Sequence, residues 1–165
     1  MTNPIEVLAK AACKRFVSRL DLTKAFLQVG LDESSQELTA FSCFLGTLCW
    51  TRCSQGLSNA PRTMHRLMDN LLRGTSAYTS CLLDDIIIFP DSYDLHEIHI
   101  REILSRLRAA NLTASLSKSE FLLKEITILG HTLHDGFISP SDKHIADVIT
   151  IGPQLTKHGV RALAF

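Results

Sequence analysis

Long apolar runs, an excess of charge of one sign and a regular cysteine framework are all missing from this sequence of 165 residues. No apolar run reaches the roughly 18 residues of a membrane-spanning helix, and the N-terminus has no apolar stretch behind a basic flank, so we expect neither a membrane anchor nor a signal peptide. Lys plus Arg number 17, as do Asp plus Glu, which argues against a general polycation. A local groove for nucleic acid stays compatible with this balance, because the distribution of charge matters more than its sum.

The five cysteines are odd in number, so at least one stays unpaired within the chain. Because their spacing matches no disulfide framework, we expect a reduced, intracellular protein, cytoplasmic or nuclear. The Cys and His pairs are too irregular to predict a structural zinc site. These are Cys49 and Cys53 with His65, His96 with His99, and His131 with His134.

Repeats, low-complexity tracts and Pro/Gly-rich linkers are absent too, and 45% hydrophobic with 21% charged residues is a globular composition. The length suits one domain over residues 1–165. Start signals and helical spacing predict helices over 4–12, 61–72 and 95–110 and from about 141 onward. Strands are expected over 16–22, 39–44, 47–52, 121–123, 126–133 and 137–138, with a tight hairpin around 81–89. This order predicts an α+β fold, with an antiparallel sheet of three or four strands backed by the helices at 61–72 and 95–110.

The sharpest polar feature is the pair Asp84 and Asp85, which interrupts an apolar run at the tip of the predicted hairpin. Adjacent carboxylates there need either water, as in a simple solvated turn, or a cation such as Mg²⁺. Asp21, at the end of the predicted strand 16–22, is a candidate third ligand, although it also suits a helix N-cap. If that strand lies beside the hairpin, the three carboxylates converge at one edge of a sheet. Such a cluster could hold two Mg²⁺ ions and support phosphoryl transfer.

A third block covers residues 55–61, Gln-Gly-Leu-Ser-Asn-Ala-Pro, where a loop meets a predicted helix. Gly56 permits close approach of a backbone or a ligand, and Gln55 can donate and accept hydrogen bonds. An ordinary loop-to-helix junction explains this block equally well when it is taken alone.

Taken in order, the three blocks resemble the palm of a reverse transcriptase, and most closely the polymerase of gypsy-type LTR retrotransposons. Residues 20–29, LDLTKAFLQV, resemble the first catalytic motif, with an aromatic residue five positions after the Asp. Residues 55–61 resemble the motif that contacts template and nucleotide, and residues 83–89, LDDIIIF, resemble the motif with paired aspartates. The match continues through 96–99, 112–121, 129–131, 135–139 and Lys143.

This resemblance implies an RNA-directed DNA polymerase that extends a primer on an RNA or DNA template with dNTPs, using two Mg²⁺ ions or Mn²⁺, without a membrane. Asp21, Asp84 and Asp85 would form the catalytic and metal-binding cluster. The other implied roles are a steric gate against a ribose 2′-hydroxyl at Phe26, contacts to nucleotide and template at Gln55 and Gly56, protonation of the pyrophosphate leaving group by Lys118, and placement of the primer end by Leu129 and Gly130. Lys118 can equally be read as a solvated turn lysine.

Two departures from the family pattern accompany the match. The family usually has Tyr two residues before the first of the paired aspartates, next to the primer; this chain has Leu82 and so lacks that hydroxyl and aromatic face. The basic residues before Asp21 do not fit the fingers pattern, and 141–165 resembles the start of a thumb. We therefore expect a palm with fingers truncated at the N-terminus and only the beginning of a thumb. An inactive remnant that binds nucleic acid, or a module that pairs with flanking polyprotein domains or a second polymerase subunit, are the alternatives.

Overall fold

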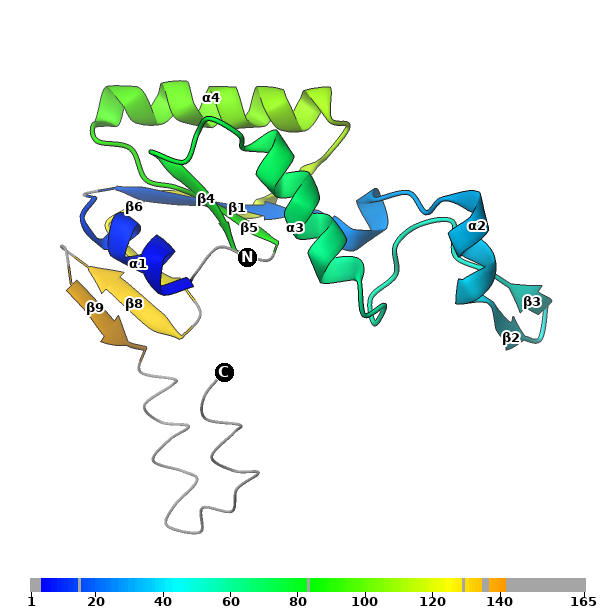
Figure 1. Cartoon of the computed structure of the whole chain (residues 1–165). Helices are drawn as coiled ribbons and strands as arrows, with labels where there is room; N and C mark the ends of the chain where they lie inside the picture. Colours follow the sequence, from blue (N-terminus) through cyan, green and yellow to red (C-terminus); the bar gives the residue numbers. More distant parts are fainter. Residues whose placement is uncertain (1–3, 15, 83, 129, 135–136, 142–165) are drawn as a thin grey trace, which may run out of the picture.

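The computed structural model describes residues 4–14, 16–82, 84–128, 130–134 and 137–141. Its centre is a four-stranded sheet in which every neighbouring pair is antiparallel (Figure 1). The strand order is β4 (Thr79–Leu82), β5 (Asp85–Ile88), β1 (Val17–Leu22) and β6 (Ala114–Leu123). The predicted α+β class and antiparallel sheet are thus confirmed.

Alternation along β1 and β5 separates two faces of this sheet, because successive side chains of a strand point to opposite sides. Leu20 and Leu22 of β1 pack with Ile86 and Ile88 of β5 in one apolar cluster. The residues between them point to the other face, among them Asp21, which is opposite Asp85 in the register.

Helices α3 (Ala60–Leu71) and α4 (Tyr93–Ala109) cover the face of Leu20 and Leu22. Figure 1 shows α4 running along the sheet, with α3 beside it. Each helix buries a pair of apolar side chains at i, i+4 spacing, which lines one stripe against the sheet. These are Met64 and Met68 in α3, and Ile103 and Leu107 in α4. The predicted helices are confirmed to within two residues at each end.

The opposite face packs against α1 (Pro4–Ala12) and a three-stranded antiparallel sheet. Its strands are β7 (Glu125–Ile128), β8 (His131–His134) and β9 (Phe137–Pro140). The single strand predicted over 126–133 is wrong, since the chain turns at Gly130, whose φ is 76°. The strand predicted over 121–123 is too short, because β6 has 10 residues.

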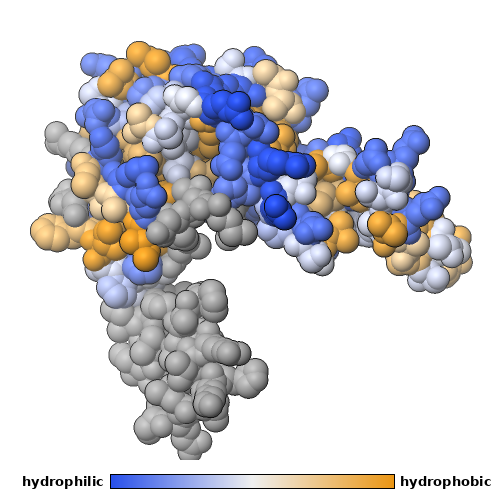
Figure 2. Space-filling model, viewed as in Figure 1, coloured by the Kyte–Doolittle hydropathy of each residue, from blue (hydrophilic) through white to orange (hydrophobic). Residues whose placement is uncertain are grey.

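A two-stranded ribbon extends from the body between β1 and α3 (Figure 1). It is reached through η1 (Ala25–Gln28), α2 (Glu33–Gln36) and η2 (Glu37–Thr39). Its strands, β2 (Phe41–Cys43) and β3 (Gly46–Leu48), are shorter than predicted. Apolar side chains gather on this arm in Figure 2, and Leu38, Phe44 and Leu45 are 87%, 96% and 71% exposed.

Three further predictions concern a membrane-spanning helix, the cysteines and the helix from about 141. Within the described residues, no helix is both long and apolar enough to cross a bilayer. None of the five cysteines, all of which lie in the described residues, forms a disulfide. Lys143 and nearly all of the helix predicted from about 141 lie outside the described residues.

Candidate active site

Strand pairing brings the predicted carboxylates together at one end of the central sheet. In the antiparallel register of β1 and β5, Asp21 is the partner of Asp85. Asp84 precedes Asp85, in the turn that joins β4 to β5. The Asp21 side chain is 25% exposed, and the two hairpin aspartates are half-buried. Three acidic groups from two distant segments of sequence therefore share one open edge.

Burial and mutual repulsion act on these carboxylates. Burial raises the pKa of Asp84, and the charge of Asp21 raises it further. Burial also raises the pKa of Asp85; the Arg19 guanidinium opposes this shift, while Asp21, Asp84 and Glu120 add to it. The Oδ1 atoms of Asp21 and Asp84 are buried and accept no hydrogen bond. The sheet edge is thus short of positive charge.

The donor set fits a hard divalent cation. Within the described ranges, no three His, Cys, Asp or Glu side chains are already gathered into a metal site. The chemistry nevertheless suits Mg²⁺ or a similar ion, which prefers carboxylate oxygens, and two such oxygens here are buried and accept no hydrogen bond. A bound cation would relieve the repulsion that raises the pKa values of Asp84 and Asp85. Asp21, Asp84 and Asp85 are therefore the residues fitted to hold one.

Strand β6 supplies the groups that surround Asp21 on its other side. The Lys118 Nζ lies 3.9 Å from the Asp21 Oδ1, on a side chain that is 70% exposed. The Asp21 backbone N–H donates to the Ser119 Oγ at 3.2 Å, and the Ser119 hydroxyl donates to the Ser115 carbonyl at 2.7 Å. The register between β1 and β6 shifts twice in this region. Such bulges change the direction of side chains. The Ser119 hydroxyl holds the Asp21 backbone in place through its hydrogen bond. No sequence motif marks Ser119 for this role.

A separate pocket of about 410 Å³ is lined by both Phe26 and Gln55, two residues for which the family resemblance implies contacts to the nucleotide. Lys24, Leu27, Trp50 and Ser54 complete its lining. Trp50 is 42% exposed and packs against Phe41 with ring centroids 6.1 Å apart. Lys24, a cationic residue that the motif comparison left aside, adds positive charge beside the aromatic wall.

The remaining predicted site residues lie in other surroundings. Gly56 has a φ of 92°, a left-handed value that glycine adopts without strain. Leu82 is 7% exposed and belongs to the core cluster beneath α1, so its side chain packs in the interior. Gly130 forms the β7–β8 turn of the three-stranded sheet, which is a different sheet from the one that carries the carboxylates. Leu129 lies outside the described residues.

Gln28 fixes the segment that presents Phe26, and sequence reasoning missed it. Its Nε2 donates to the Thr113 carbonyl at 3.0 Å and to the Thr23 carbonyl at 2.6 Å, while its Oε1 accepts from the Thr113 N–H at 2.7 Å. The amide thus pairs with both backbone groups of Thr113, just before β6, as a residue of a neighbouring strand would. No local pattern marks this role, because its main partner is 85 positions away.

Comparison with known proteins identifies a matching family. Residues 2–133 match the family model described as reverse transcriptase (RNA-dependent DNA polymerase). The "Retrovirus-related Pol polyprotein from transposon 297" of Drosophila melanogaster is 37% identical over 149 residues, which cover 90% of this chain and 14% of that polyprotein. The "Enzymatic polyprotein" of cauliflower mosaic virus (strain NY8153) is 31% identical over 153 residues, covering 93% of this chain and 22% of the viral one.

Solved structures agree on the fold. A foamy viral protease-reverse transcriptase in complex with double-stranded DNA superposes with a TM-score of 0.87 at 23% identity, covering 99% of this chain and 29% of that one. The native prototype foamy virus protease-reverse transcriptase gives a TM-score of 0.72 at 26% identity, covering 86% of this chain and 18% of that one. The chain therefore spans less than a third of each of these proteins.

Proposed function

The chain belongs to the reverse transcriptase (RNA-dependent DNA polymerase) family, and from that premise we propose that it carries the palm of a gypsy-type retrotransposon polymerase. Its reaction is the template-directed addition of a deoxynucleotide to a primer 3′ end. The primer 3′-hydroxyl loses its proton and attacks the α-phosphorus of a dNTP. One P–O bond forms, the bond to the β-phosphate bridging oxygen breaks, and pyrophosphate leaves.

One observation carries this proposal: the β1–β5 register pairs Asp21 with Asp85, and Asp84 stands beside them in the turn. The carboxylates come from motifs that are more than sixty positions apart in sequence. The raised pKa values of Asp84 and Asp85 favour an ion-binding edge over an ordinary solvated turn, as do the buried Oδ1 atoms of Asp21 and Asp84, which accept no hydrogen bond.

Asp21, Asp84 and Asp85 are proposed to hold divalent cations, Mg²⁺ or Mn²⁺. Two such ions, when bound, supply an activated primer hydroxyl and neutralise charge on the reacting phosphates. The chain itself contributes by positioning the carboxylates. Strand pairing fixes Asp21 against Asp85, and the Ser119 hydroxyl holds the Asp21 backbone. Such positioning matters because a displacement of about 1 Å can cost about a hundredfold in rate.

The Phe26–Gln55 pocket is proposed to receive the incoming nucleotide. The Phe26 ring would stand where a ribose 2′-hydroxyl projects, so that a deoxyribose fits and a ribose clashes. Gln55 would hydrogen-bond to the base pair or its sugar, and Lys24 offers a cation for the triphosphate. The two hydrogen bonds between the Gln28 amide and the Thr113 backbone keep the Phe26 segment in place.

Lys118 is proposed as the proton donor to the leaving pyrophosphate. Its ammonium group lies near Asp21 but on a largely exposed side chain, which leaves it free to turn toward a bound triphosphate. The transferred proton would come from Nζ and end on the bridging oxygen, which becomes a pyrophosphate oxygen.

The decisive experiment is primer extension on poly-riboadenylate with an oligo-deoxythymidylate primer, dTTP and Mg²⁺. We expect incorporation by the chain and a loss of at least about a hundredfold in Asp84→Asn, because the amide removes a charge from the cation site. Asp94→Asn, an equivalent change in the first turn of α4, should stay within about twofold.

Either failure in this assay is informative. A well-folded chain that incorporates nothing would overturn catalysis by this chain alone. Incorporation that survives Asp84→Asn would overturn the assignment of the carboxylates. Matching circular dichroism spectra of the three proteins would show that the comparison concerns chemistry and not folding.

A second candidate is a non-catalytic palm that binds nucleic acid and pairs with another polymerase segment or subunit. The exposed apolar arm favours it, since Phe44 and Leu45 offer surface that a partner would cover. The burial of Leu82 inside the core agrees with a site that lacks the family's aromatic contact to the primer. Nucleic-acid binding without incorporation would support this candidate.

A further inference from the structure

A groove between α4 and β6 exposes apolar side chains that the proposed reaction does not use. The groove holds about 340 Å³. Its apolar lining consists of Tyr93, Ile100 and Leu104 from α4 and Leu122 from β6. Tyr93 is 61% exposed, Leu104 42% and Leu122 38%. Contiguous apolar surface of this kind marks a place where another molecule can dock.

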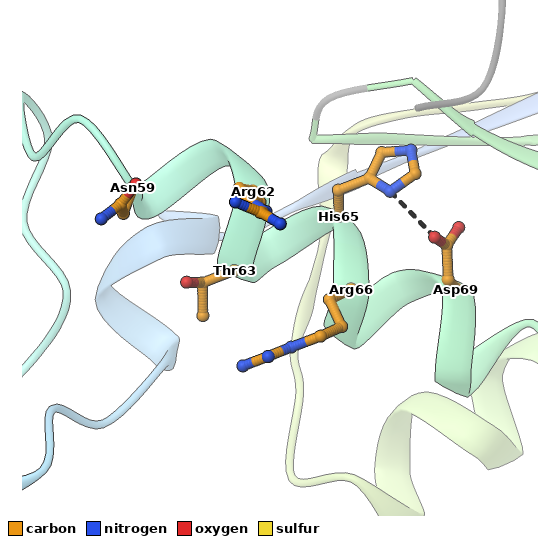
Figure 3. A pocket seen from close by; sticks show the side chains of 6 residues that line it. All are labelled: Asn59, Arg62, Thr63, His65, Arg66 and Asp69. Atoms are coloured by element: carbon orange, nitrogen blue, oxygen red, sulfur yellow. Dashed lines mark ion pairs between the residues drawn. The ribbon is translucent and has the colours of Figure 1, made fainter.

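Helix α3 carries a pocket of a different kind. It holds about 520 Å³, and every side chain that Figure 3 labels in it is polar: Asn59, Arg62, Thr63, His65, Arg66 and Asp69. The ion pair that Figure 3 marks there joins the His65 Nδ1 to the Asp69 Oδ2 at 2.9 Å. The α3 pocket therefore offers charges and hydrogen-bonding groups, whereas the α4 groove offers the apolar surface on which a second helix can dock.

Charged residues on the same side of α4 are segregated by sign. At about 3.6 residues per turn, four of them share about a third of the helix circumference with the apolar groove residues of α4. Asp94 and Glu97 come first along the helix, and Arg101 and Arg108 follow. Glu97 and Arg101 form an exposed ion pair at 2.7 Å beside the groove. Asp94 and Arg108 are exposed and have neither an ion pair nor a hydrogen bond within the described part of the chain. This side of α4 thus runs from acidic to basic.

We propose that the α4 groove is an interface between two copies of this chain, with their α4 helices antiparallel. An antiparallel copy sets the acidic end of one helix against the basic end of the other, so complementary charge fixes the orientation. With the two-fold axis near residue 99, Glu97 of one copy faces Arg101 of the other, and Tyr93 reaches the groove beside Leu104. The exposed Tyr93 ring thereby fills the hollow that the other copy presents.

Self-complementarity favours a second copy over an unrelated partner. One surface supplies both the hollow and the tyrosine that fits it, and both signs of charge in an order that an antiparallel copy reverses. A two-fold contact closes on itself, so it predicts dimers and no larger assemblies. Helix α4 has 17 residues and is about 25 Å long, so contact between two such helices is smaller than a standard interface of about 1,600 Å². We therefore expect a dimer that dissociates on dilution.

The test is sedimentation equilibrium of the chain over about a hundredfold range of protein concentration. Every protein compared carries Phe44→Ser/Leu45→Ser, which removes the apolar ribbon tip as a second source of association. We expect a monomer–dimer equilibrium, and Leu104→Ser should raise the Kd of the dimer about tenfold or more. Ile98→Ser removes another exposed apolar side chain from a different side of α4, so it should leave the Kd within about twofold.

Charge reversal tests whether the two α4 helices meet. Asp94→Lys/Glu97→Lys makes this side of α4 uniformly basic, and Arg101→Glu/Arg108→Glu makes it uniformly acidic. Each variant alone should be monomeric, because like charges then face each other. An equimolar mixture of the two should form a heterodimer, which also shows that both variants are folded. Salt tests the orientation: screening weakens the attraction between antiparallel helices, so the Kd of the unreversed chain should rise with salt.

Four results would overturn the proposal. A chain that stays monomeric at every concentration has no such interface, and equal effects of Leu104→Ser and Ile98→Ser would place the contact elsewhere. A mixture of the two charge-reversed variants that stays monomeric, with circular dichroism spectra like that of the unreversed chain, would show that the α4 helices do not meet. A Kd that falls with salt would contradict the antiparallel arrangement. The proposed function stands in each case, because the α4 groove contains none of the carboxylates and none of the nucleotide-pocket residues.

Discussion

At the scale of single residues, His96 shows how burial disfavours the charged form of an imidazole. The Ser18 hydroxyl accepts from the Leu122 N–H at 3.0 Å and shares a second hydrogen bond with the His96 Nε2, 2.6 Å away. The His96 Nδ1 is buried without a hydrogen-bond partner, so a protonated imidazolium would leave a charged N–H unsatisfied in the interior. Burial lowers the pKa of His96, and the nearby His99 lowers it further. The imidazole joins α4 to the two strands β1 and β6.

This histidine makes the fold sensitive to acid. Because the pKa of His96 is lower in the folded chain than the ordinary value of about 6.5, the unfolded chain takes up the proton first. The stabilisation is complete above about pH 6.5 and is lost as the pH falls through the folded pKa. We expect urea unfolding to give a smaller free energy at pH 5.5 than at pH 7.5.

A glutamine substitution identifies the group responsible. His96→Gln keeps a hydrogen-bonding group for Ser18 but does not titrate, so part of the pH dependence should disappear; burial also lowers the pKa of His99, which retains the rest. An unchanged pH profile in His96→Gln would contradict this account.

At the scale of secondary-structure elements, Arg106 joins α4 to the end of α3. Its Nη1 donates to the carbonyls of Leu71 and Arg73, both at 2.9 Å, and its Nη2 donates to the Glu102 Oε1 at 2.7 Å. Glu102 also accepts from the Tyr78 hydroxyl at 2.6 Å. Burial, followed by this Glu102 contact, raises the pKa of Tyr78 to about 12. One guanidinium thus satisfies carbonyls at a helix end that lack partners within the helix.

Removing this guanidinium should weaken the connection between α4 and the end of α3. We expect Arg106→Met to lower the free energy of unfolding by about 1–3 kcal/mol, because two carbonyls and a carboxylate lose their donor. Arg106→Lys should recover only part, since an ammonium group lacks the planar fork. Arg101→Met removes only an exposed i, i+4 pair with Glu97 and should cost about 0.5 kcal/mol or less. Equal losses in Arg106→Met and Arg101→Met, measured by urea denaturation, would contradict the joining role.

The sequence predicted elements whose signal is local and missed those set by distant partners. Met64 and Met68, or Ile103 and Leu107, lie one helical turn apart, so spacing alone indicated α3 and α4. Most of β6 was missed because its polar sequence has no apolar alternation and its pairing partner, β1, is about a hundred positions away. The carboxylates were predictable from motif order, whereas the Gln28 clamp and Ser119 emerge only when distant segments meet.

At the scale of the whole molecule, the projecting ribbon is the part least supported by the core. Phe44 and Leu45 lie at its tip and are almost fully or largely exposed. Exposed apolar clusters of this kind promote association between molecules. We expect Phe44→Ser/Leu45→Ser to reduce self-association in sedimentation velocity while changing the free energy of unfolding by no more than about 0.5 kcal/mol.

A buried methionine provides the comparison. Met68 is fully buried, so Met68→Ser should cost about 3 kcal/mol or more through the cavity and the unpartnered hydroxyl that it creates. A loss of similar size in Phe44→Ser/Leu45→Ser would mean that the ribbon tip contributes to the core after all.

The alternation along β1 bears on how such a chain can change over generations. Leu20 and Leu22 face the helices, while Asp21 lies on the opposite face near the end of the strand, where its side chain is 25% exposed. A point substitution of Asp21 can alter the carboxylate cluster without disturbing the apolar interior. Deletion of a single codon within β1 would exchange the two faces, turning the aspartate inward and the leucines outward. In β1, point substitutions therefore change the chain gradually, whereas an insertion or a deletion disrupts the fold in one event.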